Sequence, residues 1–492
     1  MAVAAVTGAG RLLAGALANW AQDALSVRGE RLPPSPPIRH RWLGHLHDIR
    51  TEGFVAFHRR CVQAYGPLVL LRFGPPVLGR RFLLVADPEV ALLTLTQDRQ
   101  RGYAPMTGPP LVFGEQAVFC TSGDDPVHAE RQRLIARHLA PDMLRRHAAG
   151  MTEIWTPAIE RMVSIPRGQD AVRRFDLNTE ILATVQHVSL RCWMGVEPTP
   201  SETRDTLARY FDVGSLLSAL LFDSWFFLHA RRRVKTLEKS YAGLLARSLD
   251  AILGGGDVGE DQLRFVAESL DALGWDRRRL ASCGEERARL LGSLAFYQHL
   301  FTVMLPSTGS TGGTILFLLD ELAGHPELQD QLGDELAGAD PLAVPRAPAV
   351  TAMAIRECLR LHPQAAAITR LLAQSRRYGG YFVPKGTYSF VQLDTLHRNP
   401  ASYADPERFD PARFAPPEAA LGGRWAGFSL GQMACTGRVF AELHITVFLK
   451  QLLGRYRLRR IGSGRPGHND YRGSVTLQPE PYEIEFVRKS RW

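Results

Sequence analysis

The stretch Phe428-Ser-Leu-Gly-Gln-Met-Ala-Cys-Thr-Gly-Arg438 is the most informative part of this sequence. It presents one cysteine, Cys435, from a loop that contains Gly431 and Gly437. Apolar residues recur at helical spacing beyond the loop and Gly454 supplies a stop, so the sequence predicts a helix that begins just after the cysteine. The amides and the dipole at a helix start can lower a thiol pKa from ~8.5 by several units. The loop therefore predicts a metal-binding thiolate.

The same stretch resembles the haem-binding loop of the cytochrome P450 family, whose usual pattern is F-x-x-G-x-R-x-C-x-G. Phe428, Gly431, Cys435 and Gly437 match in register, while Met433 stands at the usual arginine. The resemblance implies haem b (iron protoporphyrin IX), with Cys435 as its axial ligand and Phe428 shielding the sulfur. That arginine usually contacts a haem propionate, so Met433 puts one such contact in doubt. The alternative is a buried structural cysteine, because cysteine is commonly buried.

A second segment places Glu357 and Arg360 one helical turn apart, just before Pro363 ends the helix. Most such pairs are exposed and contribute about 0–1 kcal/mol. The resemblance adds Arg413, within Pro406–Phe414, as the third member of a buried Glu-Arg-Arg network. A buried charge without its partner would cost roughly 3–5 kcal/mol. The alternative is three unrelated surface charges.

Further haem contacts follow from the resemblance alone. The segment Asp124–Arg133 resembles the C helix of the family, whose first turn supplies groups to the propionates, so His128 and Arg133 are candidates. Arg370 leads into a predicted strand, where the family commonly places another propionate ligand. Without the resemblance, a lone histidine on a helix is more often a surface residue.

An apolar helical pattern runs from about Arg287 to Leu322 and contains the small, hydroxyl-rich run Leu305–Thr314. Glycine in a helix costs ~1 kcal/mol relative to alanine and interior proline ~3, so this run must bend or open the helix unless packing compensates. The resemblance makes it the oxygen-binding groove, where an acid and a hydroxyl deliver protons. Gly309 stands at the acid position, and Ser310 or Thr311 at the hydroxyl position.

The missing acid leaves three functions open. Ser310, Thr311 and ordered water could suffice for a monooxygenase that oxidises an apolar molecule. Alternatively, the enzyme could use hydrogen peroxide or rearrange a hydroperoxide or endoperoxide, substrates that already carry the O–O bond. A haem protein without turnover is the third possibility. In a purely structural interpretation, the two hydroxyls bond the carbonyls of the preceding turn.

The whole chain of 492 residues is expected to be mostly α (α+β), with one large catalytic domain at 35–492 after an N-terminal segment at 1–34. That segment has no clear membrane span and could be amphipathic or an organelle-targeting peptide. The 6 cysteines show neither a zinc-site nor a disulfide pattern, which favours the cytoplasm, with mitochondrial or peripheral membrane locations as alternatives. The predicted strands lie near Leu68–Phe73, Phe82–Val85, Tyr381–Val391 and Ser474–Val487.

The net charge of +9 is dispersed and no nucleic-acid motif occurs, so nucleic acid is not expected as a partner. By resemblance, electrons would come from a separate ferredoxin or flavoprotein, and we expect a monomer. The substrate would be a small apolar lipid, steroid, terpenoid or polyketide-like molecule. The segments expected by resemblance to line its pocket are Tyr103–Phe119, Val213–Leu221, Ala365–Ile368 and Ser474–Thr476.

Overall fold

The computed structural model describes residues 29–75, 79–97, 112–118, 120–164, 177–222, 227–254, 263–343, 349–416, 422–462, 464–471 and 476–489, with the side chains of 214–222 and 227–231 left out. Most of the predicted N-terminal segment, 1–34, lies outside these residues. The chain forms two compact units. The smaller unit comprises Met1–Pro105, Ala367–Pro406 and Leu421–Ala434, and the larger unit comprises Met106–Ala366, Glu407–Ala420 and Cys435–Trp492.

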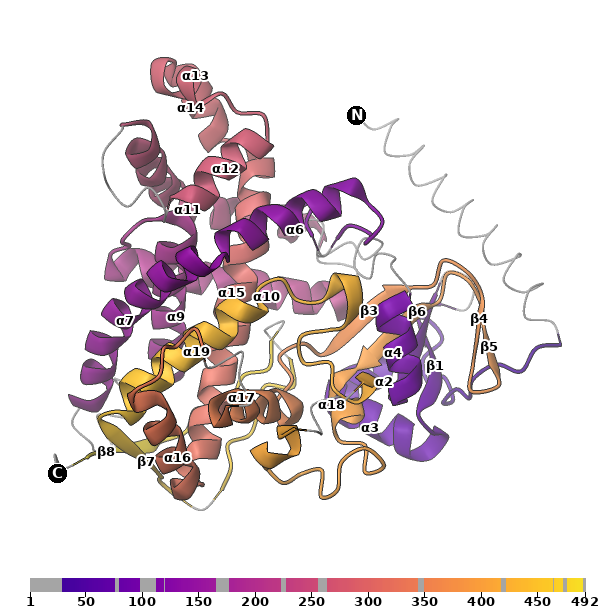
Figure 1. Ribbon diagram of the computed structural model, residues 1–492. Coiled ribbons are helices and arrows are strands. Elements are labelled where there is room, and N and C mark those ends of the chain that lie inside the picture. Colours follow the sequence, from indigo (N-terminus) through magenta and orange to yellow (C-terminus); the bar gives the residue numbers. More distant parts are fainter. Residues whose placement is uncertain are drawn as a thin grey trace. The chain divides into compact units, whose positions relative to one another are not determined.

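The smaller unit is built on a four-stranded sheet in the order β1-β2-β6-β3 (Figure 1). β1 (Leu68–Phe73) and β2 (Arg80–Val85) are antiparallel, β2 is parallel to β6 (Tyr388–Gln392), and β6 is antiparallel to β3 (Ala367–Leu371). A second, two-stranded sheet pairs β4 (Arg376–Tyr378) with β5 (Tyr381–Val383). Apolar side chains of these strands, such as Leu83 and Val391, form the core of this unit with Ala91 and Leu95.

The helices of the smaller unit are short. They are α2 (Leu46–Glu52), α3 (Phe54–Tyr65), α4 (Pro88–Gln97), α18 (Leu393–His397) and the single turns η4 (Gly422–Arg424) and η5 (Gly431–Met433). Both η4 and η5 pack on α4. This contact positions the first half of the loop from Phe428 to Arg438.

The larger unit is almost entirely helical. Its helices are α6 (Pro126–His138), α7 (Pro141–Ser164), α9 (Leu177–Met194), α10 (Pro200–Phe222), α11 (Phe227–Leu253), α12 (Arg264–Ala272), α13 (Arg277–Ser282), α14 (Gly284–Leu291), α15 (Leu294–Ala323), α16 (Pro326–Ala337), α17 (Val350–Leu361), η3 (Pro411–Phe414) and α19 (Arg438–Leu453). A two-stranded antiparallel sheet of β7 (Tyr456–Arg460) and β8 (Ile484–Arg488) completes it. The central α15 packs on α9, α17 and α19 (Figure 1).

The prediction of a helix-rich chain with small sheets is confirmed. The single helix expected from Arg287 to Leu322 is wrong in one respect, because α14 ends at Leu291 and α15 begins at Leu294. Gly292 weakens the helix there and Ser293 takes an extended conformation. Among the residues described from 476 to 487, the expected strand is limited to β8, since Pro479 and Pro481 cannot donate to a strand ladder.

Within the described residues, no helix combines the length and apolar character needed to cross a bilayer.

Buried aromatic rings and histidines surround α19. The ring of His444 lies 5.7 Å from that of Trp155, and the ring of His147 lies 5.6 Å from that of Phe440 and 4.8 Å from that of His138. Burial lowers the pKa of His138 to about 4 and those of His147 and His444 to about 3. These histidines are therefore neutral in the folded protein at neutral pH.

The stability of the larger unit is expected to fall as the pH drops below 6.5, the ordinary histidine pKa. Between pH 6.5 and about 4 the unfolded chain binds more protons than the folded chain, so protonation favours unfolding. The three histidines therefore do not lower the free energy of unfolding above this range, and they lower it progressively within the range. Each of these histidines is expected to lower the free energy of unfolding by roughly 2 kcal/mol at about pH 5. Thermal unfolding near neutral pH and at about pH 5 measures the loss.

The variant His444→Leu provides a direct check. In the part of the chain that the structure describes, neither ring nitrogen of His444 has a hydrogen-bond partner, so the substitution removes no hydrogen bond. We expect little change in stability near neutral pH and a shallower loss in acid. An unchanged pH dependence would contradict this assignment.

Candidate active site

The cysteine loop leads directly into α19. Gly437 is the N-cap residue, α19 begins at Arg438, and Cys435 lies just before the cap, as predicted. Cys435 is exposed to solvent. A β-carbon built on Gly437 would meet only the Sγ atom of Cys435, at 3.9 Å. Protein packing therefore does not require glycine at 437, but a side chain there would stand beside the sulfur.

The protein alone raises the pKa of the Cys435 thiol. Partial removal from water is the largest cause, and the negative charge of Glu442 acts in the same direction. The backbone N–H groups of Gly437 and Arg438 and the positive charge of Arg438 lower the pKa, but they do not outweigh the desolvation. The expected lowering of this pKa is therefore wrong for the protein by itself. A coordinated metal deprotonates a thiol outright, so metal binding does not require a lowered pKa beforehand.

The first half of the loop belongs to the smaller unit. Phe428 is half-buried, and its ring lies 6.1 Å from that of Trp425, edge to face. Gly431 has φ +72°, and its β-carbon would lie 2.8 Å from the carbonyl oxygen of Leu95 in α4. Both facts require glycine at 431. Met433, at the position of the usual arginine, is half-buried.

Arg370 is buried within β3 of the same unit. Its Nη1 donates to the carbonyl of Thr369 at 2.9 Å, and its Nη2 donates to the hydroxyl of Ser429 at 3.4 Å. Ser429 has φ +61°, an uncommon conformation for a residue other than glycine. The arginine predicted to hold a propionate is thus fixed to the cysteine loop through Ser429.

The two candidates on α6 differ in their surroundings. His128 lies in the first turn, is buried, and has its Nδ1 3.1 Å from the hydroxyl of Thr121. Arg133 is exposed. The buried arginine of this helix is Arg131, one turn after His128 and on the same face. Spacing from His128 would have been the signal for preferring Arg131, which the sequence analysis missed.

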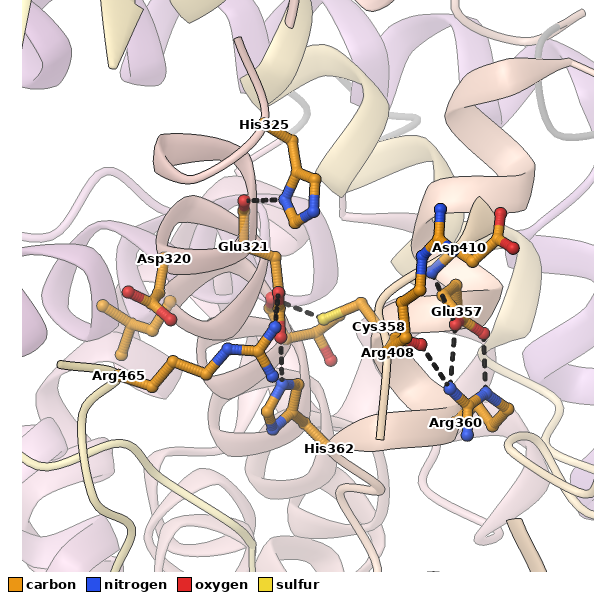
Figure 2. Close-up of polar contacts among 12 residues, drawn as sticks. Asp320, Glu321, His325, Glu357, Cys358, Arg360, His362, Arg408, Asp410 and Arg465 are labelled. Atoms are coloured by element: carbon orange, nitrogen blue, oxygen red, sulfur yellow. Dashed lines mark hydrogen bonds and ion pairs between the residues drawn. The ribbon is translucent and has the colours of Figure 1, made fainter. Parts of the chain in front are cut away.

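Glu357 and Arg360 form an ion pair in the larger unit (Figure 2), and Arg413 approaches the same carboxylate. Arg360 donates from Nε and Nη2 to the two carboxylate oxygens of Glu357, at 2.7 and 2.8 Å, and both side chains are 0% exposed. Arg360 also donates to the carbonyl of Arg408 at 3.0 Å, and Glu357 accepts from the amide of Asp410 at 2.8 Å. Burial raises the pKa of Glu357, against the lowering effect of Arg360 and Arg413.

A second buried carboxylate, Glu321 at the end of α15, lies in the same view (Figure 2). Its Oε1 lies 3.0 Å from Nε2 of His362, and its Oε2 lies 3.1 Å from Nη2 of Arg465. Burial alone would raise the pKa of Glu321, but the hydrogen bond with His362 and the charge of Arg465 leave it lowered. Local sequence patterns do not indicate this contact, because it joins distant segments.

The hydroxyl-rich run stays helical within α15. The hydroxyl of Ser310 donates to the carbonyl of Pro306 at 2.6 Å, which is the structural role considered in the sequence analysis. Thr308 is buried and donates to Oε1 of Gln186 at 2.5 Å. Thr311 is 2% exposed, and its hydroxyl has no hydrogen-bond partner among the described residues. Ser310, unlike Thr311, is partly accessible to solvent.

Each glycine of this run faces a specific neighbour. A β-carbon on Gly309 would overlap the hydroxyl of Tyr210 from α10. On Gly312 it would lie 2.5 Å from a methyl group of Leu182, and on Gly313 it would overlap the amide of Gln364. Packing thus explains why α15 remains continuous despite these residues.

The predicted site residues therefore fall into separate groups. Cys435 with Gly437, the trio around Glu357, and Ser310 with Thr311 belong to the larger unit, as do His128 and Arg133. Arg370, Phe428 and Gly431 belong to the smaller unit. The predicted pocket segments Tyr103–Phe119, Val213–Leu221 and Ser474–Thr476 lie partly outside the described residues or side chains.

The variant Arg360→Ala is expected to cost roughly 3–5 kcal/mol, because it leaves the buried charge of Glu357 without its main partner. Arg413→Ala should cost less, since Arg413 is 14% exposed and its Nε lies 3.4 Å from Glu357. Arg408→Ala is the matched control: its side chain is exposed, and only its carbonyl contacts Arg360. Urea unfolding measures the loss of stability in each variant. Equal losses in the three variants would contradict the expected order.

Comparison with known proteins identifies the family of this chain. The family model for cytochrome P450 matches residues 33–486. Pentalenene oxygenase of Streptomyces avermitilis is 26% identical over 421 residues, covering 81% of this chain and 85% of that protein. Cyclooctatin synthase of Streptomyces melanosporofaciens is 25% identical over 454 residues, covering 85% of this chain and 89% of that protein.

A solved structure of cyanobacterial CYP120A1 with bound retinoic acid has the same fold. The TM-score is 0.73 at 17% sequence identity, and the match covers 94% of this chain and 100% of that chain. At this identity the likeness concerns the fold alone. Because the family model spans nearly the whole sequence and the helix-rich fold agrees, this chain belongs to the cytochrome P450 family.

Proposed function

We propose that this chain is a haem-thiolate monooxygenase that oxidises a small apolar molecule, with Cys435 as the axial ligand. The observation that carries the proposal is the exposed Cys435 at the start of α19, in a chain whose family implies a haem cofactor. No other cysteine of the described chain lies beside a glycine N-cap in this way.

The residues around Cys435 fit a flat iron porphyrin. Cys435 is an exposed residue, and Gly437 keeps the space beside its sulfur free of a side chain. Thiolate sulfur is a ligand that iron accepts, and a cysteine ligand favours cleavage of an O–O bond. His128, Arg133 and Arg370 stay predictions as propionate contacts, and the geometry of α6 adds Arg131 as a further candidate.

Ser310 and Thr311 would handle protons at the oxygen site. The Ser310 hydroxyl donates to Pro306 and keeps its lone pairs free to accept a hydrogen bond from water or a reactant. The Thr311 hydroxyl, which bonds no described residue, could donate to such a group. Neither side chain ionises, so their role would be to orient and pass protons.

The substrate class rests on the relatives. The two Streptomyces proteins are named for pentalenene and cyclooctatin, and the solved structure contains retinoic acid. We extend this to a terpenoid, steroid, lipid or polyketide-like substrate for the present chain. A separate ferredoxin or flavoprotein would supply electrons.

One observation favours a second function, the use or rearrangement of peroxides. No residue from Leu305 to Thr314 carries a titratable side chain, and the Tyr210 hydroxyl fills the space next to Gly309. A substrate that already contains the O–O bond would need less help from an acid at this point of α15. The two functions differ in whether they consume electrons from a donor.

Cys435→Ser is expected to change the absorption spectrum of the purified pigment and of its ferrous carbon monoxide complex, because a thiolate ligand would be lost. Cys283→Ser is the matched control, since Cys283 is also exposed in the larger unit but far along the chain from the loop. Identical spectra for Cys435→Ser and the wild type would overturn the assignment of the ligand.

The oxidant can be determined by turnover of a terpenoid and steroid panel under two conditions. A monooxygenase should form product with dioxygen, NADPH and a reductase system, and it should consume one equivalent of NADPH per product. A peroxide-using enzyme should turn over an organic hydroperoxide with no electron donor. Absence of product in both conditions, with haem bound, would favour a haem protein without catalytic turnover.

A further inference from the structure

Gly309 lies where a side chain of α10 contacts the backbone of α15. The hydroxyl of Tyr210, from α10, lies where the β-carbon of any other residue at 309 would be, and the ring carbon that bears this hydroxyl is 2.7 Å from that point. Tyr210 is buried, with 3% of its surface exposed. Gly309 therefore forms a notch that admits a phenol to the backbone of α15.

Other polar groups converge on the same notch. The hydroxyl of Thr476 lies 2.9 Å from the position of the Gly309 β-carbon. The Gln478 amide donates to the Gly309 carbonyl at 3.0 Å and to the Thr476 hydroxyl at 2.9 Å. Two hydroxyls and an amide are thus gathered at one turn of α15, directly before Ser310.

This grouping brings an ionisable side chain, that of Tyr210, to the Gly309 turn of a segment that has none of its own. The run Leu305–Thr314 contains only apolar residues, glycines and hydroxyl side chains. Of the groups at the notch, Thr476 and Gln478 do not ionise in water, whereas a phenol can donate a proton or a strong hydrogen bond. Glycine makes a helix less stable than alanine does. The contact with Tyr210 that Gly309 permits has to compensate for this loss.

We infer that Tyr210 is a positioning residue for the reaction at Ser310 and Thr311. Its phenol hydroxyl, held in the Gly309 notch with Thr476, supplies a hydrogen-bond donor that orients water or a peroxide oxygen beside Ser310. The inference rests on the proposed function, because it assigns a role in the same site. It holds for either oxidant, since both require a protonated oxygen at this point.

The notch itself can be tested without any turnover. Gly309→Ala is expected to lower the melting temperature in the wild type and in Tyr210→Phe, because the ring carbon at 2.7 Å excludes a β-carbon in both. In Tyr210→Ala the same change should lower the melting temperature less, since only the Thr476 hydroxyl, at 2.9 Å, still opposes the β-carbon. A stabilising Gly309→Ala in the wild type would show that Tyr210 does not occupy the notch and would overturn the inference.

The chemical role is tested with Tyr210→Phe, which keeps the ring and removes the hydroxyl. The ratio of product formed to oxidant consumed should fall roughly three- to tenfold, the loss expected for one neutral hydrogen bond. The solvent deuterium isotope effect on turnover should rise, because donation to oxygen becomes more rate-limiting. Substrate affinity, read from the spectral shift on binding, should not change.

Tyr297→Phe is the matched control. Tyr297 is equally buried near the start of α15, and its hydroxyl donates to the carbonyl of Leu291 at 3.1 Å. It should lose a comparable hydrogen bond but keep the product ratio and the isotope effect. If Tyr210→Phe and Tyr297→Phe behave alike in an active enzyme, the inference fails while the proposed function stands. A wild type inactive with both oxidants contradicts the proposed function, and the inference falls with it.

Discussion

A carboxylate that is fully removed from water needs a positive charge or a hydrogen-bond donor at each of its oxygens. In the larger unit, Glu357 is such a carboxylate. Arg360 satisfies both of its oxygens from the next turn of α17. The remaining positions are filled from a distant segment, by the Asp410 amide and the Arg413 guanidinium. The segment from Arg408 to Phe414 is therefore fixed on α17 by one charge. Such a network is weak evidence for added stability, but the loss of one partner is strongly destabilising because it leaves a buried charge uncompensated.

The continuity of α15 shows packing overcoming intrinsic preference. Pro306 and three glycines lie within a single run, and each unfavourable residue would weaken an isolated helix. The glycines are placed where Tyr210, Leu182 and Gln364 approach too closely for a side chain. The helix can therefore bring its backbone near polar groups of other elements without unwinding. Its shape is determined by its neighbours more than by its own sequence.

Much of the fold followed from local patterns. The start of α19 after Cys435, its end before Gly454, and β1 were predicted because caps, helical spacing and short apolar runs are local signals. The pairing of Glu357 with Arg413 followed from resemblance to a family, not from spacing. The break between α14 and α15 was missed, since one glycine inside a helical pattern is usually tolerated.

The rest depended on contacts between distant segments. Arg133 was predicted and Arg131 was overlooked, because the spacing from His128 was not used to define the face of α6 that becomes buried. The approach of Tyr210 to Gly309 joins residues far apart in the sequence, and only the glycine itself hinted at it. The direction of the Cys435 pKa shift was misjudged for a related reason: helix amides are local, whereas desolvation depends on everything that surrounds the sulfur.

The buried Glu321 ties the C-terminal part of the chain into the interior. Arg465 lies beyond the β7 strand, yet it supplies one of the two partners of a carboxylate in α15, and Arg460 pairs with the neighbouring Asp320. A proteolytic cut or an engineered truncation after Tyr456 would strip both acids of their arginines. The segment after Tyr456 is therefore needed to neutralise the two acids at the end of α15. A fusion partner for purification is better attached through a spacer, without removing residues of this segment.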